Sequence, residues 1–184
     1  GLLPCALIED KPRFSHRGFM LDVGRYFMPL DEVKKFVDFM LMHKLNVFHL
    51  HLTEDQGWRV EIKKYPLLTK LGSRRSHTNF GIRPHGGFYT QAQLKELVSY
   101  CHERHIAVIP EIDMPGHMQA AIHCYPQLSC FDRKLPVATH WGVKHDILCA
   151  GKDFSLQFVC DVLDEIGGLF PDGFVHLGGD EAPK

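Results

Sequence analysis

The feature that most constrains the fold is a repeated change in the spacing of apolar residues along the chain. Residues 18–23, 46–52, 106–111 and 174–178 are short runs rich in residues that suit a pleated sheet, as expected of strands. Between these runs, apolar residues recur every three or four positions, as on one face of a helix. Strands that alternate with helices in this way predict parallel βαβ units.

Three helices are expected between the strands. The first begins near Leu30, and its apolar face comprises Val33, Phe36, Val37, Met40 and Leu41. The second opens on a capping-box pair, Thr90 and Gln93, ends near His105 and buries Leu94, Leu97, Val98 and Cys101. The third follows a long loop at 125–152 and buries Phe158, Val159, Val162, Leu163 and Ile166. Residues 53–89 are expected to be irregular, apart from a short strand at 58–62.

Parallel βαβ units fit two architectures, a doubly wound open sheet and a TIM barrel. The polar residues at the carboxyl ends of the strands distinguish between them. These residues are Asp22, Arg25, Glu54, Asp55, Glu111, Asp113, His117, Asp180 and Glu181. A barrel gathers such residues around one mouth, whereas an open sheet spreads them along an edge. We therefore predict an α/β fold of the TIM (β/α)8 barrel type, with only about the first four βα units present in this chain.

The segment 176–181, His-Leu-Gly-Gly-Asp-Glu, is the sharpest candidate for chemistry. Neighbouring side chains on a regular strand point to opposite faces, so Asp180 and Glu181 can share a cleft only if the backbone bends. Gly178 and Gly179 allow that bend. Two close carboxyl groups do not both ionise easily, and one that keeps its proton is a general acid. The alternative is that the acidic pair, with Pro183, caps a following helix.

Charge and chemistry at the mouth restrict the class of partner. The formal net charge is −1, which gives no electrostatic case for binding nucleic acid or a membrane surface. No apolar run approaches the ~20 residues of a membrane span. The residues expected around the mouth of the barrel are mainly acidic and can form hydrogen bonds, and the sequence has no Gly-rich phosphate loop. Such a site suits a neutral polyhydroxylated ligand. A carbohydrate is therefore the expected partner.

Four segments, 17–25, 49–59, 110–117 and 176–181, resemble in order and spacing the motifs of family 20 glycoside hydrolases, the β-N-acetylhexosaminidases. The resemblance covers nearly the whole chain. It implies that residues 15–184 are the N-terminal half of a catalytic (β/α)8 domain and that residues 1–14 are a linker from a preceding domain. A full barrel takes ~250 residues, so we expect these 184 alone to be inactive or poorly folded.

The resemblance also implies a reaction, the removal of a terminal β-linked N-acetylhexosamine with retention of configuration. In this substrate-assisted scheme the 2-acetamido oxygen of the sugar attacks the anomeric carbon and forms an oxazolinium-like intermediate. Glu181 would protonate the leaving oxygen and then deprotonate water, while Asp180 would hold the acetamido N–H. No cofactor and no metal are expected.

The remaining site residues are implied by the same resemblance. Arg25 would donate a forked pair of hydrogen bonds to sugar hydroxyls. Glu54 and His117 would line the pocket floor and support the catalytic pair, and Asp55 and Asp113 are further substrate-binding candidates. Many relatives carry Asp-Asp where this chain has Glu54–Asp55, which leaves open which of the two pairs with its neighbours.

Two other classes of protein compete with this interpretation. His49 and His51 form an HxH motif that suits a metal-dependent amidohydrolase barrel, although histidines hydrogen-bonded in the core are the favoured explanation. The second competitor is a non-catalytic carbohydrate-binding fragment, because only four of the eight strands of a full barrel are expected in this chain. A chelator assay separates the metal alternative from the glycosidase.

Several residues carry simpler expectations. Trp58 and Trp141 are either sugar-stacking aromatics or loop packing, Arg17 braces a strand start, and Arg74–Arg75 is solvated surface. Cys101 and Cys160 are expected in the core. Cys124, Cys130 and Cys149 fall near one long loop and are candidates for pairing in an oxidising compartment.

Overall fold

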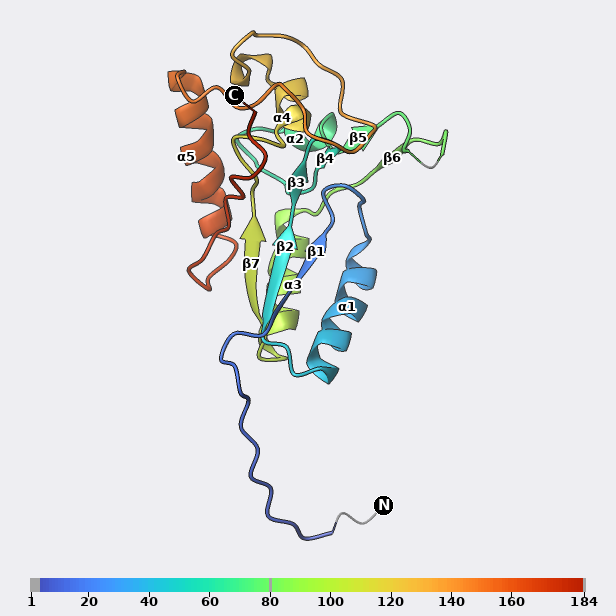
Figure 1. Ribbon diagram of the computed structural model, residues 1–184, viewed down its shortest axis with the longest axis vertical. Helices are drawn as coiled ribbons and strands as arrows, with labels where there is room; N and C mark the ends of the chain where they lie inside the picture. The colour runs from blue at the N-terminus through green and yellow to red at the C-terminus, as the bar shows by residue number, and fades with distance from the viewer. Residues whose placement is uncertain (1–3, 80, 184) are drawn as a thin grey trace.

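The computed structural model describes residues 4–79 and 81–183, so the first three residues of the expected 1–14 linker lie outside it. Its centre is a parallel sheet of β1 (Gly18–Asp22), β2 (Val47–His51) and β7 (Ala107–Glu111), in the order β1-β2-β7. The register aligns Asp22 with His51 and His51 with Glu111. Three polar residues therefore end the three strands side by side. Figure 1 shows all three arrowheads at one end, where the irregular segments gather.

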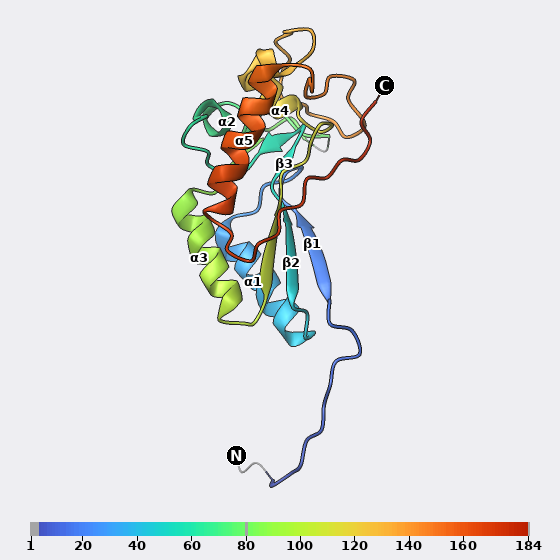
Figure 2. The same ribbon diagram turned by 90° about the vertical axis from the view of Figure 1, so that its left-hand side faces the viewer.

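Two helices cover one face of this sheet, as Figure 2 shows from the side. α1 (Leu30–Met42) buries Val33, Val37 and Met40, and its Phe36 ring packs against Phe48 of β2. α3 (Gln91–His102) begins with the expected capping box, in which Thr90 Oγ1 accepts the Gln93 N–H at 3.2 Å. The first three predicted strands, the first two helices and their parallel connections are therefore confirmed.

The opposite face of the sheet presents another set of side chains. Gly18, Met20, Val47, His49 and Ile109 line an open hollow of about 620 Å³, together with Phe14, His16, Arg17, Phe19 and His176. Arg17 braces the start of β1, as expected, because its guanidinium donates to Lys44 O and Phe14 O at 2.6 Å each. Met20 on this face is 47% exposed, which is unusual for the middle of a sheet strand.

The fourth predicted strand is much reduced. Residues 174–178 form one parallel bridge, between His176 and Glu111, rather than a regular strand. Backbone bonds from Ile112 N to His176 O, at 3.0 Å, and from Met114 N to Leu177 O, at 3.0 Å, hold the segment beside the end of β7. Pairing stops because Gly178, with φ of 66°, turns the chain away. The expected strand at 58–62 is also shorter, since β4 (Gly57–Trp58) pairs with β3 (Thr53–Glu54).

The remaining elements are mostly short. They are α2 (Leu67–Lys70), β5 (Arg74–Arg75), β6 (His85–Gly86), α4 (Gln119–Cys124) and η1 (Pro126–Leu128). A longer helix, α5 (Asp153–Gly167), follows them in the chain. The third predicted helix is α5, which buries Phe158, Val162 and Ile166. No helix in the described part of the chain is long and apolar enough to cross a bilayer.

Two expectations about surface and core are wrong. Arg75 is buried, and its guanidinium donates to Gln56 O at 2.9 Å, so only Arg74 of the pair is exposed. Cys160 is exposed, because it lies outside the face of α5 that carries Phe158 and Val162, whereas Cys101 is buried as expected.

The remaining cysteines and tryptophans divide similarly. Of the three loop cysteines, Cys130 and Cys149 form a disulfide, and Cys124 is a buried free thiol. Trp58 is core packing, with its ring against Phe158 and its N–H donated to Val60 O at 2.8 Å. Trp141 lies on the surface of the long loop.

Candidate active site

The site begins with an arginine at the end of β1. Arg25 Nη1 donates to Asp22 Oδ2 at 2.8 Å, and Arg25 Nη2 lies 2.6 Å from Glu54 Oε1. Asp22 Oδ1 also accepts the Arg25 backbone N–H at 2.9 Å, so both ends of Arg25 are held by one carboxylate. Burial opposes the charge on Arg25, but Asp22 and Glu54 together raise its pKa. Arg25 is therefore a fixed cation whose side chain remains partly exposed.

Glu54 occupies the middle of the site and is fully buried. Its Oε2 atom accepts the Asp55 N–H at 2.9 Å and lies 3.1 Å from His117 Nδ1, while Oε1 lies 3.4 Å from His51 Nε2. Burial disfavours the carboxylate, yet His117 and His51 lower the pKa of Glu54 to about 2. The carboxylate is thus a permanent anion surrounded by cationic groups.

Asp55 lies behind His117 rather than beside Arg25. Its Oδ1 atom accepts the Gln119 N–H at 2.9 Å, and its Oδ2 atom is 3.6 Å from His117 Nδ1. This geometry answers which member of the Glu54–Asp55 pair contacts the arginine, since the longer Glu54 side chain does so. Both carboxylates contact one imidazole, and the anions of Asp55 and Glu54 raise the pKa of His117 to about 11 despite its burial.

The charged ring of His117 faces the acidic pair that the sequence singles out. His117 Nε2 lies 3.4 Å from Glu181 Oε2 and 3.6 Å from Asp180 Oδ2. The two neighbouring carboxylates therefore converge on one cation. Backbone φ values of 66° at Gly178, 91° at Gly179 and 48° at Glu181 produce the turn that makes this possible. The predicted bend at the tandem glycines is present.

Asp113 supports the same turn from below. Its Oδ1 atom accepts the Gly179 N–H at 3.3 Å, and a Cβ atom at Gly178 would lie only 1.8 Å from that oxygen. The Asp113 backbone N–H is in turn bonded to Thr53 Oγ1 at 3.0 Å. Burial, with a further contribution from Asp180, raises the pKa of Asp113 to about 7. Asp113 is thus a buried carboxyl that is partly protonated at neutral pH.

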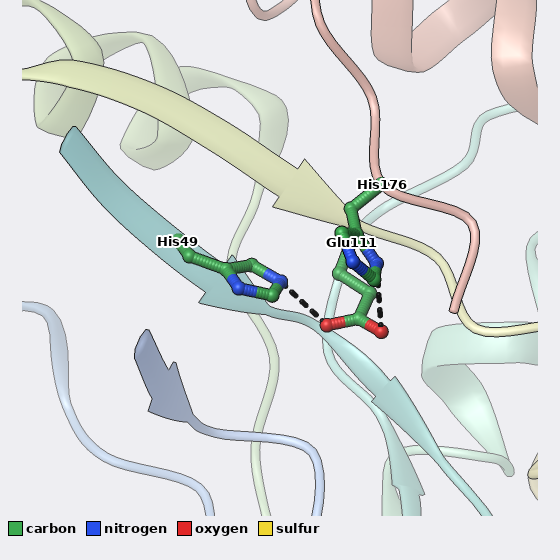
Figure 3. A group of neighbouring side chains, drawn as sticks. All are labelled: His49, Glu111 and His176. Carbon is green, nitrogen blue, oxygen red and sulfur yellow. Dashed lines mark hydrogen bonds and ion pairs between the residues drawn. The ribbon is translucent and has the colours of Figure 1, made fainter. Parts of the chain in front are cut away.

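A second polar group lies deeper in the sheet and is drawn in Figure 3. Glu111 Oε2 lies 2.6 Å from His49 Nε2 and 2.7 Å from His51 Nδ1. His176 Nδ1 lies 3.1 Å from Glu111 Oε1 and 3.0 Å from the Gly178 N–H. One ring nitrogen serves only one of these two partners, according to whether it carries a proton.

Within the described residues, two of the groups whose donor atoms lie close enough to hold a metal contain the HxH histidines. They are His49–Glu111–His176 and His51–Glu54–Asp113. In each, however, the imidazole nitrogens already lie at hydrogen-bond or ion-pair distance from carboxylates. This is the arrangement of core histidines that the sequence favours over a metal centre.

The structure brings all seven predicted site residues into one contact network, comprising Arg25, Glu54, Asp55, Asp113, His117, Asp180 and Glu181. Sequence reasoning assigns no such contact to Asp22, His51 or Glu111. Their contacts follow from the parallel register, which aligns these three residues at the strand ends and which no local sequence pattern supplies. Asp22 and Arg25 are also three residues apart, close enough for a local ion pair.

Comparison with known proteins gives a consistent set of similarities. Residues 14–184 match the family model described as "Glycosyl hydrolase family 20, catalytic domain". The chain is 52% identical over 182 residues to a beta-hexosaminidase of Porphyromonas gingivalis and 48% identical over 182 residues to one of Akkermansia muciniphila. The two matches cover 99% and 98% of this chain, but only 23% and 37% of the length of the respective relatives.

Solved structures show the same similarity. A crystal structure of a beta-N-acetylhexosaminidase superposes with a TM-score of 0.92 at 48% identity, covering 95% of this chain and 37% of that one. A mutant beta-hexosaminidase of Streptomyces plicatus, in complex with its product GlcNAc, gives a TM-score of 0.88 at 44% identity, covering 94% of this chain and 34% of that one.

Proposed function

Because the chain belongs to glycosyl hydrolase family 20, we propose that it contributes the acid/base half of an active site that removes terminal β-linked N-acetylhexosamine from glycans. The observation that carries this proposal is the convergence of Asp180 and Glu181 on His117, at 3.6 and 3.4 Å. The GlcNAc product named in the Streptomyces plicatus complex supports the class of sugar.

The proposed reaction retains the anomeric configuration and uses the substrate as its own nucleophile. Glu181 gives its proton to the glycosidic oxygen while the 2-acetamido oxygen of the sugar bonds to the anomeric carbon and the leaving group departs. Water then opens the oxazolinium-like intermediate, and Glu181 takes back the water proton. Asp180 accepts a hydrogen bond from the acetamido N–H and stabilises the positive charge on that group. Because no carboxylate acts as nucleophile, two adjacent acids suffice.

His117 and Glu54 support this proton transfer. When Glu181 gives up its proton it becomes an anion, and the His117 imidazolium at 3.4 Å stabilises that anion. Glu54 holds His117 from the other side at 3.1 Å and keeps the ring charged. Such distances tighten when substrate binds, so the loose ion pair between His117 and Glu181 is compatible with the role.

The other predicted residues divide into direct and indirect contacts. Arg25, partly exposed and fixed by Asp22 and Glu54, would donate to sugar hydroxyls. Asp55 and Asp113 are almost fully buried, so we assign them an action through their neighbours. Asp55 orients His117, and Asp113 supports the glycine turn.

We further propose that the chain forms the first four βα units of a TIM (β/α)8 barrel, after a linker at 1–14. The exposed sheet face with its hollow of about 620 Å³ supports this, since the inner face of a barrel sheet is normally packed. The match to only 23% and 37% of the two relatives agrees with it. On this basis the 184 residues alone are inactive.

The decisive experiment expresses the full-length protein that contains this chain and assays three aryl glycosides. We expect hydrolysis of the N-acetylglucosaminide or the N-acetylgalactosaminide and none of the plain glucoside, because the glucoside lacks the 2-acetamido nucleophile. Asp180→Asn should slow the acetamido substrates without removing the proton donor. Equal rates on the glucoside and the acetamido sugars would refute the substrate-assisted reaction.

A further inference from the structure

A line of alternating acidic and imidazole side chains runs from the end of the central sheet to Glu181. Glu111 Oε2 lies 2.7 Å from His51 Nδ1, and the other nitrogen of that ring, Nε2, lies 3.4 Å from Glu54 Oε1. Glu54 Oε2 then lies 3.1 Å from His117 Nδ1, whose Nε2 faces Glu181 Oε2 at 3.4 Å. Each of the two imidazoles therefore bridges two carboxylates, one through each nitrogen.

Charge alternates along this line. Burial opposes the His51 imidazolium, but Glu111 and Glu54 overcome it and raise the pKa of His51 to about 10. The pKa of Glu111 lies below its ordinary value because His49 and His51 bond to it despite its burial. At neutral pH, Glu111 and Glu54 are therefore anions, and the two imidazoles that alternate with them, His51 and His117, are cations. Buried charges of this kind persist only when each is paired.

Other charged groups also face this line. Asp22 and Asp113 lie close to His51, and Arg25 shares Glu54 Oε1 with it. The Glu111 end is fixed further by His49, 2.6 Å from Oε2, and by His176, 3.1 Å from Oε1, so each carboxylate oxygen has an imidazole partner (Figure 3). Glu111 is therefore the anchored end of the line, and Glu181 is its exposed end.

We propose that Glu111 and His51 are positioning residues for proton transfer by Glu181, acting through Glu54 and His117. Neither contacts the sugar in the proposed reaction. Without the Glu111 anion, the His51 cation loses its nearest partner, and the positive charge 3.4 Å from Glu54 Oε1 is no longer held in place. Glu54 then holds His117 less firmly, and the cation that faces Glu181 is displaced. This inference rests on the proposed function, because it assigns an indirect role in the same acid/base step.

A test that separates this role from a general loss of structure varies the leaving group. Hydrolysis of a dinitrophenyl N-acetylglucosaminide needs little protonation, whereas hydrolysis of the methylphenyl analogue needs a general acid. In the full-length protein, we expect Glu111→Gln to lower kcat/KM for the methylphenyl substrate about 30-fold, a part of the 10²–10⁴ that general acid catalysis contributes. The dinitrophenyl substrate should lose about 3-fold or less.

His49→Gln is the matched control. It removes another imidazole from the same Glu111 oxygen but leaves the His51–Glu54–His117 line in place, so both substrates should slow by the same factor. His51→Gln should reproduce the unequal loss, and the double variant should be no worse than the poorer single variant, because both act through one route. Should Glu111→Gln unfold below the assay temperature, the unequal loss is required of His51→Gln alone.

Equal losses on the two substrates in Glu111→Gln and His51→Gln would overturn the proposal, as would additive effects in the double variant. Failure of the proposed function would give a different result. In that case the unmodified full-length protein would hydrolyse neither substrate, or Glu181→Gln itself would slow both equally.

Discussion

The site consists of two regions that the protein holds in opposite ways. The buried region, Glu54, Asp55 and His117, lies at the ends of the central strands, and the side chains of Glu54 and His117 are 0% and 4% exposed. The doublet region, residues 176–181, follows a single bridge to β7, and the side chains of Asp180 and Glu181 are 59% and 55% exposed. The two regions meet at one side chain, His117.

The difference shows where preorganisation comes from in this molecule. In the buried region, ionised side chains pair with one another in a low-dielectric setting, so each fixes the charge and direction of the next. In the doublet region, backbone bonds and two glycines set the direction, and the carboxylates remain in contact with water. The buried region thus sets a fixed field, and the doublet region carries the groups to which we assign proton transfer.

The largest expected effect separates the two regions by activity. In the full-length protein, Glu181→Gln should lower kcat for an aryl N-acetylhexosaminide about 10³-fold, because the general acid and base is lost. The thermal unfolding temperature should stay within about 2 °C, since an exposed side chain contributes little to stability. Steady-state kinetics and calorimetry measure the two quantities, and a full loss of activity accompanied by unfolding would break the comparison.

The second effect should appear mainly as lost stability. Glu54→Gln removes the one anion that faces Arg25, His51 and His117 together, and leaves each of these buried or half-buried cations with one carboxylate partner fewer. Breaking a buried pair costs about 3–5 kcal/mol, so the unfolding temperature should fall by about 10 °C. Unchanged stability in Glu54→Gln would contradict the division into a buried and an exposed region.

A third, smaller effect sharpens the boundary between the regions at Asp113. Its pKa of about 7 lies above the ordinary value, so the folded protein binds a proton that the unfolded chain releases near pH 4. The contribution of Asp113 to the free energy of unfolding is therefore fully present below about pH 4 and is lost as the pH rises to about 7. Asp113→Asn removes this loss, so its unfolding temperature relative to the unmodified protein should rise between pH 5 and pH 8.

Asp161→Asn is the control for that measurement. Hydrogen bonds from Lys64 and Tyr65 lower the pKa of Asp161, so its contribution is present above about pH 4 and constant from pH 5 to pH 8. The Asp161 variant should therefore be destabilised equally at both pH values. A parallel response of the two variants would show that Asp113 is ionised in the folded protein throughout this range.

The smallest expected effect is none. Excess chelator should leave hydrolysis unchanged, because His49 and His51 of β2 already bond to Glu111 and the proposed reaction uses no metal. Loss of activity that added zinc restores would instead favour the amidohydrolase alternative and assign His49, Glu111 and His176 to a metal centre.

The sequence predicts the central sheet and the clustering of the seven candidate residues, because both depend on short-range patterns and on the common direction of the strands. The period of apolar residues identifies β1, β2 and β7, and the capping box at Thr90 identifies the start of α3. The position of Glu54, Asp113 and Glu181 after strands suffices to bring them to one edge. Parallel strands make this inference safe, since all their carboxyl ends lie together.

Features that depend on long-range packing escape the sequence. The pairing of His51 with Glu111, 60 residues apart, requires the strand register, which no local pattern supplies. Arg75 looks like solvated surface but is buried with its guanidinium bonded to Gln56 O, and Cys160 suits a core but lies on the exposed side of α5. The fourth strand is shortened by the same glycines that orient the doublet, because a backbone that turns cannot continue to pair.

The close approach of Gly178 to Asp113 restricts which residues can occupy position 178. With only 1.8 Å available between Asp113 Oδ1 and a new Cβ, no larger residue is tolerated at 178 while an aspartate occupies 113. Shortening residue 113 would relieve the clash but not the positive φ. Position 178 is therefore closed to side chains on two independent grounds, and a library that varies it alone, with Asp113 retained, should return only glycine.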